Sequence, residues 1–133
     1  MTYWKPVAAT LVLALVCAGT LGAQPPAFKR TVIQKQDLSM PGREVVQAVA
    51  ELPAGVAAGR HTHPGEEVGY LMEGTLTLMV EGKPPVTVKA GESFFVPAGV
   101  VHDGKNEGGA TAKVLATYIV EKGKPLATAV SPK

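Results

Sequence analysis

The sequence predicts an all-β domain, built as an antiparallel sandwich or a small barrel. The 133 residues include 15 glycines and 11 prolines, 26 together, a content that suits many tight turns. These residues separate short apolar runs, and no amphipathic segment is long enough for a helix of three turns. Short strands at close, turn-bounded intervals are typical of closed antiparallel folds, and a chain of this length is expected to form one domain.

The N-terminal residues 1–23 have the pattern of a secretory signal peptide. Lys5 precedes an apolar run over 7–16, and small residues follow up to Ala23. The run is shorter than the roughly 20 apolar residues that span a membrane. We therefore expect cleavage after Gly22 or Ala23 and a periplasmic or secreted protein, without stable membrane association. An uncleaved anchor is the alternative. The only cysteine, at position 17, lies in this segment, so the mature chain would have no disulfide.

Turn-forming residues mark where each expected strand ends, because glycine adopts a positive φ cheaply and proline fixes φ. The turns are expected at 41–42, 53–55, 64–65, 73–74, 81–83, 90–92, 97–99 and 106–109. The apolar segments between them predict strands over 28–36, 44–52, 61–63, 67–72, 75–80, 86–88, 94–96, 100–102 and 114–120.

These strands divide the rest of the chain into three parts. A flexible leader and the first strand cover 24–44, a barrel covers 45–120, and a polar tail covers 121–133. The tail is expected to be loose or to lie on the surface. The 110 residues that follow the signal peptide (133 minus 23) are a modest but sufficient length for a small barrel.

Strand periodicity assigns faces to several residues. Side chains alternate between the two faces of a strand, so Gly69 and Leu71 share the inward face of Glu67, and the residues between them point outward. Five apolar residues are expected in the core: Leu76, Leu78, Phe94, Phe95 and Val96. Glu66, Arg60, Asp103 and Lys105 are expected at the surface, with the last two in a loop.

All three histidines of the chain lie in two short segments bounded by turns. His61 and His63 are two residues apart, so on a strand both rings can reach one point. Glu67 follows the Pro64–Gly65 turn, and its carboxylate can meet the same point. His102, which follows the turn at 97–99, could supply a fourth ligand. A bare His-x-His pair is more often structural, but here no histidine is left over and a carboxylate completes the set.

These segments resemble the two signature motifs of the cupin superfamily at every fixed position. The matching patterns are Gly55-x5-His61-x-His63-x3-Glu67-x6-Gly74 and Gly91-x5-Pro97-x-Gly99-x2-His102-x3-Asn106. The resemblance covers roughly 45–119 and implies a small jelly-roll β-barrel with a single cupin domain. It supports His61, His63, Glu67 and His102 as metal ligands. Asn106 is expected to fix a turn.

Three imidazoles and one carboxylate suit one divalent transition metal. Iron, manganese, nickel, copper and zinc are all compatible with these ligands, and iron is slightly favoured here. Four protein ligands would leave two positions of an octahedral ion for substrate, water or dioxygen. Open positions favour a catalytic over a purely structural metal.

Three functions are compatible with this site. The first is a metal-dependent enzyme with dioxygenase-like chemistry on a small organic molecule, and it is favoured. The second is a redox-neutral lyase, decarboxylase or isomerase, and the third is a non-catalytic module that binds or senses a metal, sugar or small acid. No Arg or Lys is placed inside by the pattern to bind a carboxylate substrate, which disfavours oxalate-type chemistry.

The charge pattern and the first strands indicate which binding partners to expect. The formal net charge is only +2 and no basic patch is visible, so nucleic acid is not an expected partner. A homodimer is expected, because small barrels of the cupin superfamily often pair through outer strands, and residues 28–52 could supply one.

Overall fold

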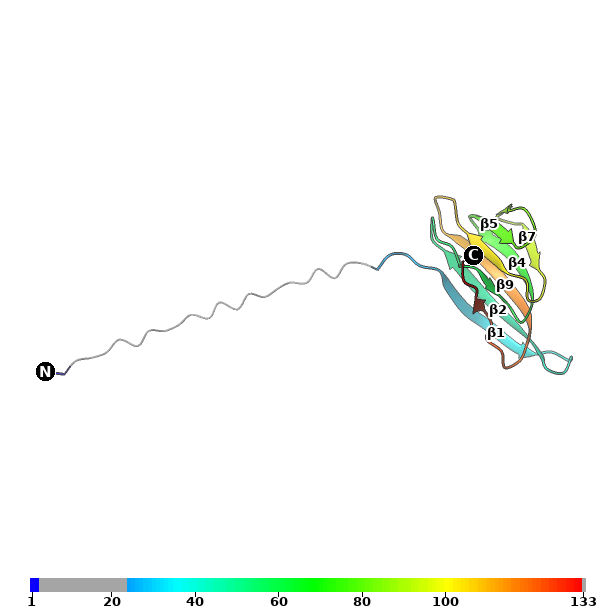
Figure 1. Cartoon of the computed structure of the whole chain (residues 1–133), viewed down its shortest axis with the longest axis horizontal. Coiled ribbons are helices and arrows are strands. Elements are labelled where there is room, and N and C mark those ends of the chain that lie inside the picture. The colour runs from blue at the N-terminus through cyan, green and yellow to red at the C-terminus, as the bar shows by residue number, and fades with distance from the viewer. Residues whose placement is uncertain (3–23, 133) are drawn as a thin grey trace.

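The computed structural model describes residues 1–2 and 24–132, and it confirms an all-β jelly-roll barrel (Figure 1). Two five-stranded antiparallel sheets form it, in the orders β1-β2-β9-β4-β7 and β10-β3-β8-β5-β6. The strands are β1 (Lys29–Asp37), β2 (Arg43–Leu52), β3 (His61–Thr62), β4 (Gly65–Glu73), β5 (Thr75–Val80), β6 (Val86–Lys89), β7 (Ser93–Val96), β8 (His102–Lys105), β9 (Ala112–Glu121) and β10 (Thr128–Ala129).

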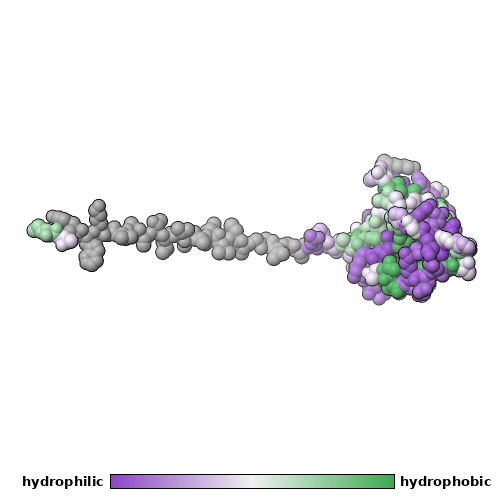
Figure 2. Space-filling view, turned by 90° about the horizontal axis from the view of Figure 1, so that it is seen from below, coloured by the Kyte–Doolittle hydropathy of each residue, from purple (hydrophilic) through white to green (hydrophobic). Residues whose placement is uncertain are grey.

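The expected signal peptide, residues 1–23, lies outside the described residues except for its first two positions. Within the described part of the chain, no helical segment has the length and hydropathy needed to cross a membrane. The space-filling view in Figure 2 shows a face of the barrel on which hydrophilic residues predominate, with hydrophobic residues in separate patches.

Strands β2 and β9 form the centre of the first sheet and pair over ten residues each. In both strands buried and partly exposed residues alternate strictly, as expected for strands with one face against a core. Figure 1 shows β1, β2, β9 and β4 side by side in this sheet. The buried apolar residues of both sheets form one cluster: Val46, Ala48, Ala50, Leu52, Leu71, Leu76, Leu78, Val88, Val96, Ala112, Val114, Ala116, Tyr118 and Val120.

A row of small residues crosses the inner face of this sheet. Ala48 pairs with Ala116, which pairs with Gly69, and Gly69 pairs with Phe94 on β7. A Cβ built on Gly69 would lie 2.1 Å from Cζ of Phe94, so the ring occupies the space that a side chain would fill. The missing Cβ thus sets the position of the Phe94 ring inside the barrel.

Two expectations about apolar and polar residues were wrong. Phe95 is 55% exposed, because it follows the inward-facing Phe94 directly and consecutive strand residues point to opposite faces. Asp103 and Lys105 are not in a loop but in β8, where they pair with Met79 and Thr77 of β5. The strand expected over 100–102 stopped too early, because the residues that follow His102, Asp-Gly-Lys, carry no apolar alternation. The expected parity of β4 is confirmed, with Glu67, Gly69 and Leu71 buried.

Of the two arrangements expected for the tail, the structure shows the one on the barrel surface and not the loose one. Thr128 and Ala129 form β10 and pair with Thr62 and His61 of β3. The N–H of Val130 donates a hydrogen bond to the carbonyl of Arg60, at 2.9 Å. The polar composition of the tail hides these contacts, because they use the backbone rather than apolar side chains. The tail therefore completes the sheet that carries two of the candidate ligands.

Candidate metal centre

Four buried side chains converge between the two sheets, and they are the four predicted ligands. One potential ligand atom from each of His61, His63, Glu67 and His102 lies within 4.8 Å of the others. His61 and His102 are direct cross-strand neighbours on β3 and β8, and His63 follows β3. Glu67 enters from the opposite sheet, where β4 pairs with β9. The pairing of the strands thus brings side chains from both sheets to one point.

Backbone carbonyls fix the orientation of all three histidine rings. The Nδ1 atoms of His61, His63 and His102 lie 2.6, 2.6 and 2.9 Å from the carbonyl oxygens of Gly59, Leu126 and Val100. A carbonyl oxygen only accepts hydrogen bonds, so each Nδ1 carries the proton and donates. In a neutral ring, Nε2 then has a free lone pair. This is the tautomer that a metal-ligating histidine needs.

The Nε2 atoms meet a carboxylate that cannot satisfy them in this tautomer. Nε2 of His63 and Nε2 of His102 both lie 3.0 Å from Oε2 of Glu67. Nε2 of His63 is buried and makes no hydrogen bond. With Nδ1 protonated, Nε2 could donate to Glu67 only if the ring became a cation. A metal ion would satisfy the imidazole lone pairs and the carboxylate together, so the residues fit a divalent transition metal.

The charges at the site favour the state that binds metal. Burial lowers the pKa of His61 to about 4, against the hydrogen bond to Gly59, and nearby His102, His63 and Arg30 lower it further. Burial alone would raise the pKa of Glu67, but contacts with His102 and His63, which lower it only when these rings carry a proton on Nε2, hold it at about 2 in the metal-free protein. A metal ion in place of those protons would keep the carboxylate ionised in the same way. At neutral pH, His61 is therefore neutral and Glu67 ionised, as metal coordination requires.

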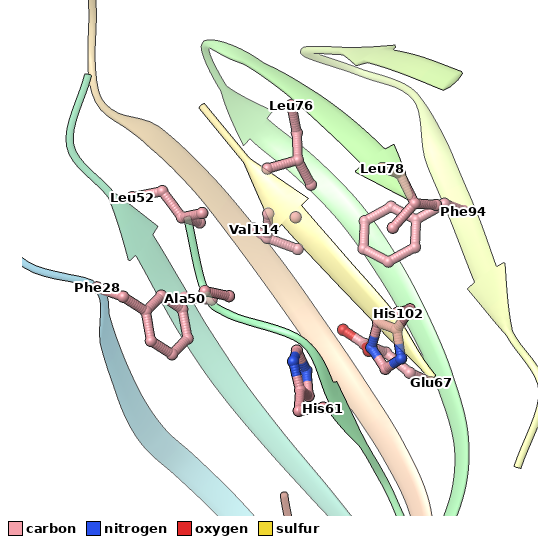
Figure 3. A pocket seen from close by; sticks show the side chains of 12 residues that line it. Phe28, Ala50, Leu52, His61, Glu67, Leu76, Leu78, Phe94, His102 and Val114 are labelled. Carbon is pink, nitrogen blue, oxygen red and sulfur yellow. The ribbon is translucent and has the colours of Figure 1, made fainter. Parts of the chain in front are cut away.

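An apolar cavity of about 40 Å³ adjoins the candidate ligands. Figure 3 shows His61, Glu67 and His102 at its polar end and hydrophobic side chains around the rest. Because one water occupies roughly 10–15 Å³ by this measure, the space suits a few waters or a small molecule. The lining residues are Phe28, Ala50, Leu52, Ala58, His61, Glu67, Leu76, Leu78, Phe94, His102, Gly104 and Val114.

The sequence analysis did not predict the positions of two residues near the centre. The ring of Tyr118, which is 1% exposed, lies 4.6 Å from that of His63, between ring centroids. The guanidinium carbon of Arg30 lies 5.7 Å from the Tyr118 ring centroid. Arg30 is partly buried and does not line the cavity beside the candidate ligands, so the expectation that no basic residue is placed there to bind a carboxylate stays a prediction. Arg30 faces inward because it pairs with Ala50, and only the register of β1 and β2 reveals this.

Polar residues around the ligands support the backbone that holds the rings. Oδ1 of Asp103 accepts a hydrogen bond of 2.9 Å from the N–H of Gly59, whose carbonyl holds His61. Nδ2 of Asn106 donates to the carbonyls of Leu52 and Ala110, at 2.8 and 2.7 Å. Asn106 therefore fixes the turn, as predicted.

A family model described as "Cupin domain" matches residues 48–118, more than half of the chain. The chain belongs to the cupin domain family. The matched region contains all four candidate ligands. The recognition based on the two motifs is thereby confirmed.

One lyase matches over less than half of its own length. Dimethylsulfoniopropionate lyase DddQ of Ruegeria pomeroyi is 35% identical over 54 residues, 41% of this chain and 27% of the lyase. The chain matches the crystal structure of that lyase at a TM-score of 0.61 and 24% identity, over 67% of this chain and 44% of the other. The chain thus spans less than half of the length of this relative.

Two further solved structures share the fold. A cupin domain of Bordetella pertussis Tohama I matches with a TM-score of 0.57 and 26% identity, over 74% of this chain and 98% of that chain. Oxalate oxidase in complex with the substrate analogue glycolate matches with a TM-score of 0.64 and 23% identity, over 81% and 57%. The barrel is therefore shared with an isolated domain and with parts of larger proteins.

Acidification is expected to destabilise the metal-free protein. In the unfolded protein, His61 takes up a proton as the pH falls below its ordinary pKa of 6.5. In the folded protein it does so only near its lowered pKa of about 4. Glu67 acts in the same sense, from the ordinary pKa of 4.5 down to a folded pKa of about 2. In both windows the unfolded state binds more protons, so the free energy of unfolding falls as pH falls.

Urea unfolding of chelator-treated protein at about pH 7 and about pH 4.5, followed by circular dichroism, measures this effect. The His61→Gln variant is the control and should lose less stability between the two conditions. Equal or greater stability of the original protein at the lower pH would contradict the prediction.

Proposed function

We propose that this protein is an enzyme that binds one divalent transition metal through His61, His63, Glu67 and His102. The orientation of the three rings carries the proposal, because their Nδ1–H groups are held by backbone carbonyls, and Nε2 of both His63 and His102 faces Glu67. Iron is our first candidate, with manganese, nickel, copper and zinc as alternatives. A bound ion would supply Lewis acidity and a template for a small organic molecule.

The chain contributes a small, largely apolar space beside this centre. Phe94 and Leu78 are among the hydrophobic residues that limit the cavity to about 40 Å³. Such apolar walls lower the polarity around the polar end, so charges there interact more strongly than they would in bulk solvent. These features support a small-molecule substrate. Tyr118 adds a phenol whose pKa burial and Glu67 raise to about 12, so it stays protonated at neutral pH.

Two reaction classes follow from different observations. The ligand set supports oxygen-dependent, dioxygenase-like chemistry. The 54-residue likeness to dimethylsulfoniopropionate lyase supports a redox-neutral elimination. Incubating iron-loaded protein with dimethylsulfoniopropionate and a panel of small organic acids, in air and under anaerobic conditions, separates them. Turnover without oxygen supports the lyase class. Oxygen uptake coupled to turnover supports the dioxygenase-like class. Tight ligand binding without turnover would favour a non-catalytic binding module.

Loss of a ligand side chain is expected to release the metal. The His61→Ala and His102→Ala variants should bind metal at least about tenfold more weakly, because even changes to residues behind the ligands cost that much. Metal content by mass spectrometry, together with competition by a chelator, measures the effect. Glu66→Gln, which alters the half-buried neighbour of Glu67, is the matched control and should retain the metal. Stoichiometric, tight metal in both histidine variants would contradict the proposed centre.

We also propose an exported homodimer. The signal-peptide pattern of residues 1–23 supports export, and the edge strand β1 supports pairing, because Val32 and Ile33 on it are 52% and 56% exposed. Intact mass and sedimentation of protein purified from its natural compartment test both. We expect a chain that lacks residues up to 22 or 23 and twice the monomer mass in solution. A full-length chain, or a monomer at high micromolar concentration, would contradict the respective part.

A further inference from the structure

The ring of His63 is oriented by a distant segment of the chain, unlike the rings of the other two histidines. His61 and His102 donate from Nδ1 to carbonyls that lie two residues before them. His63 donates to the carbonyl of Leu126, 63 residues further along the chain, with Nδ1 and the oxygen 2.6 Å apart. The orientation of this candidate ligand therefore depends on where the C-terminal tail lies.

The tail is held in place by backbone pairing with the strand that carries His61. Ala129 of β10 pairs with His61 of β3, and the N–H of Val130 donates a hydrogen bond of 2.9 Å to the carbonyl of Arg60. Figure 1 shows the C-terminal end of the chain at the barrel. Both residues of β10 have exposed side chains, so the pairing depends on backbone hydrogen bonds and not on side-chain burial.

The packing between the tail and the barrel is incomplete. The side chain of Leu126 is partly buried and packs against the core, but it also lines a cavity of about 160 Å³. Val46 of β2 and Val120 of β9 line the same cavity from the inner face of the first sheet. Segments with few buried apolar contacts and exposed backbone hydrogen bonds open at a lower free energy than core strands do. We therefore expect the tail to undock while the barrel stays folded.

The docked tail leaves one buried atom unsatisfied when no metal is bound. With Nδ1–H of His63 donated to Leu126, a neutral ring has only a lone pair on Nε2. This Nε2 is buried and makes no hydrogen bond, which costs free energy. A metal ion would use the lone pair, so a bound metal stabilises the docked arrangement.

Undocking would release the ring into the other tautomer. Nδ1 of His63 would lose the carbonyl that accepts its proton. Nε2–H could then donate to Oε2 of Glu67, which lies 3.0 Å away and within the range of a hydrogen bond. That arrangement satisfies the ring and the carboxylate without a metal, but it occupies both of them as ligands. Metal binding therefore requires the docked arrangement.

We propose that Leu126 is a positioning residue for the metal centre, and that docking of the tail and binding of the metal favour each other through the ring of His63. This inference rests on the proposed function for its metal. A ligand shifts an equilibrium only when it binds the two arrangements differently, and here only the docked tautomer offers Nε2. The coupling is reciprocal: the factor by which docking raises the metal affinity is also the factor by which metal raises the docking equilibrium.

The experiment compares the unaltered protein with Val130→Pro, which removes the N–H bound to the carbonyl of Arg60 and keeps every candidate ligand. In metal-free protein, nitrogen-15 nuclear magnetic resonance shows which imidazole nitrogen carries the proton. We expect the proton on Nδ1 at all three histidines of the unaltered protein. In Val130→Pro it should move to Nε2 at His63 alone, because the carbonyls that hold the other two rings are local.

The affinity for zinc, measured by competition with a chelator, should fall about tenfold in Val130→Pro, as for other losses behind a metal ligand. Leu126→Ala removes the contact with the core and keeps the carbonyl, so it is a milder second variant with the same expected direction. In the unaltered protein, zinc should slow hydrogen exchange at the N–H of Val130. Circular dichroism shows whether each variant is folded.

Ser131→Pro is the matched control, because it places a proline one residue later, at an exposed position whose N–H makes no backbone hydrogen bond within the described part of the chain. Its His63 tautomer and zinc affinity should be unchanged. An unchanged tautomer or an unchanged zinc affinity in the folded variants, or equal exchange of Val130 with and without zinc, would overturn the proposal. If the unaltered protein takes up no zinc, the proposed function fails, and the His63 tautomer of metal-free Val130→Pro still decides whether the tail orients the ring.

Discussion

The candidate centre depends on three hydrogen bonds from histidine Nδ1 groups to backbone carbonyls. Gly59 and Val100 lie just before β3 and β8, and Leu126 lies in the tail. Each bond decides which ring nitrogen keeps a lone pair and where that lone pair points. Without these bonds the rings could rotate and take the other tautomer. The ligand geometry is therefore set by loops and by the tail as much as by the strands.

The barrel places the candidate ligands next to one another in surroundings of low polarity. Cross-strand pairing brings His61 beside His102, and the second sheet brings Glu67 from the other side. Burial disfavours the imidazolium form of His61, so its pKa falls to about 4. Burying an ionised carboxylate costs several kcal/mol unless a cation compensates it. The fold thus creates a site whose polar groups are best satisfied together by one cation.

Much of this arrangement could be predicted from the sequence, because strand periodicity and turn residues are local signals. The spacing of His61 and His63, and the inward parity of Glu67, Gly69 and Leu71, needed no tertiary information. The features that were missed depend on contacts between distant segments. Arg30 faces inward because of its register against β2, and the tail is held by backbone pairing, which leaves no side-chain pattern. Phe95 was misplaced because two adjacent phenylalanines in a strand cannot both be buried on one face.

Some parts of the site lie inside the region that the cupin family model matches, and others lie outside it. The family match covers 48–118 and includes every candidate ligand and Tyr118. Phe28 and Arg30 lie before it, and Leu126, whose carbonyl orients His63, lies after it. The matched region thus accounts for where a metal would bind, whereas the ring orientation of His63 and the partly buried Arg30 come from segments outside it. The cavity is lined mostly by residues inside the match, so the segments outside it add only Phe28 to the cavity wall and the carbonyl that orients His63, and fold and ligands alone permit several chemistries.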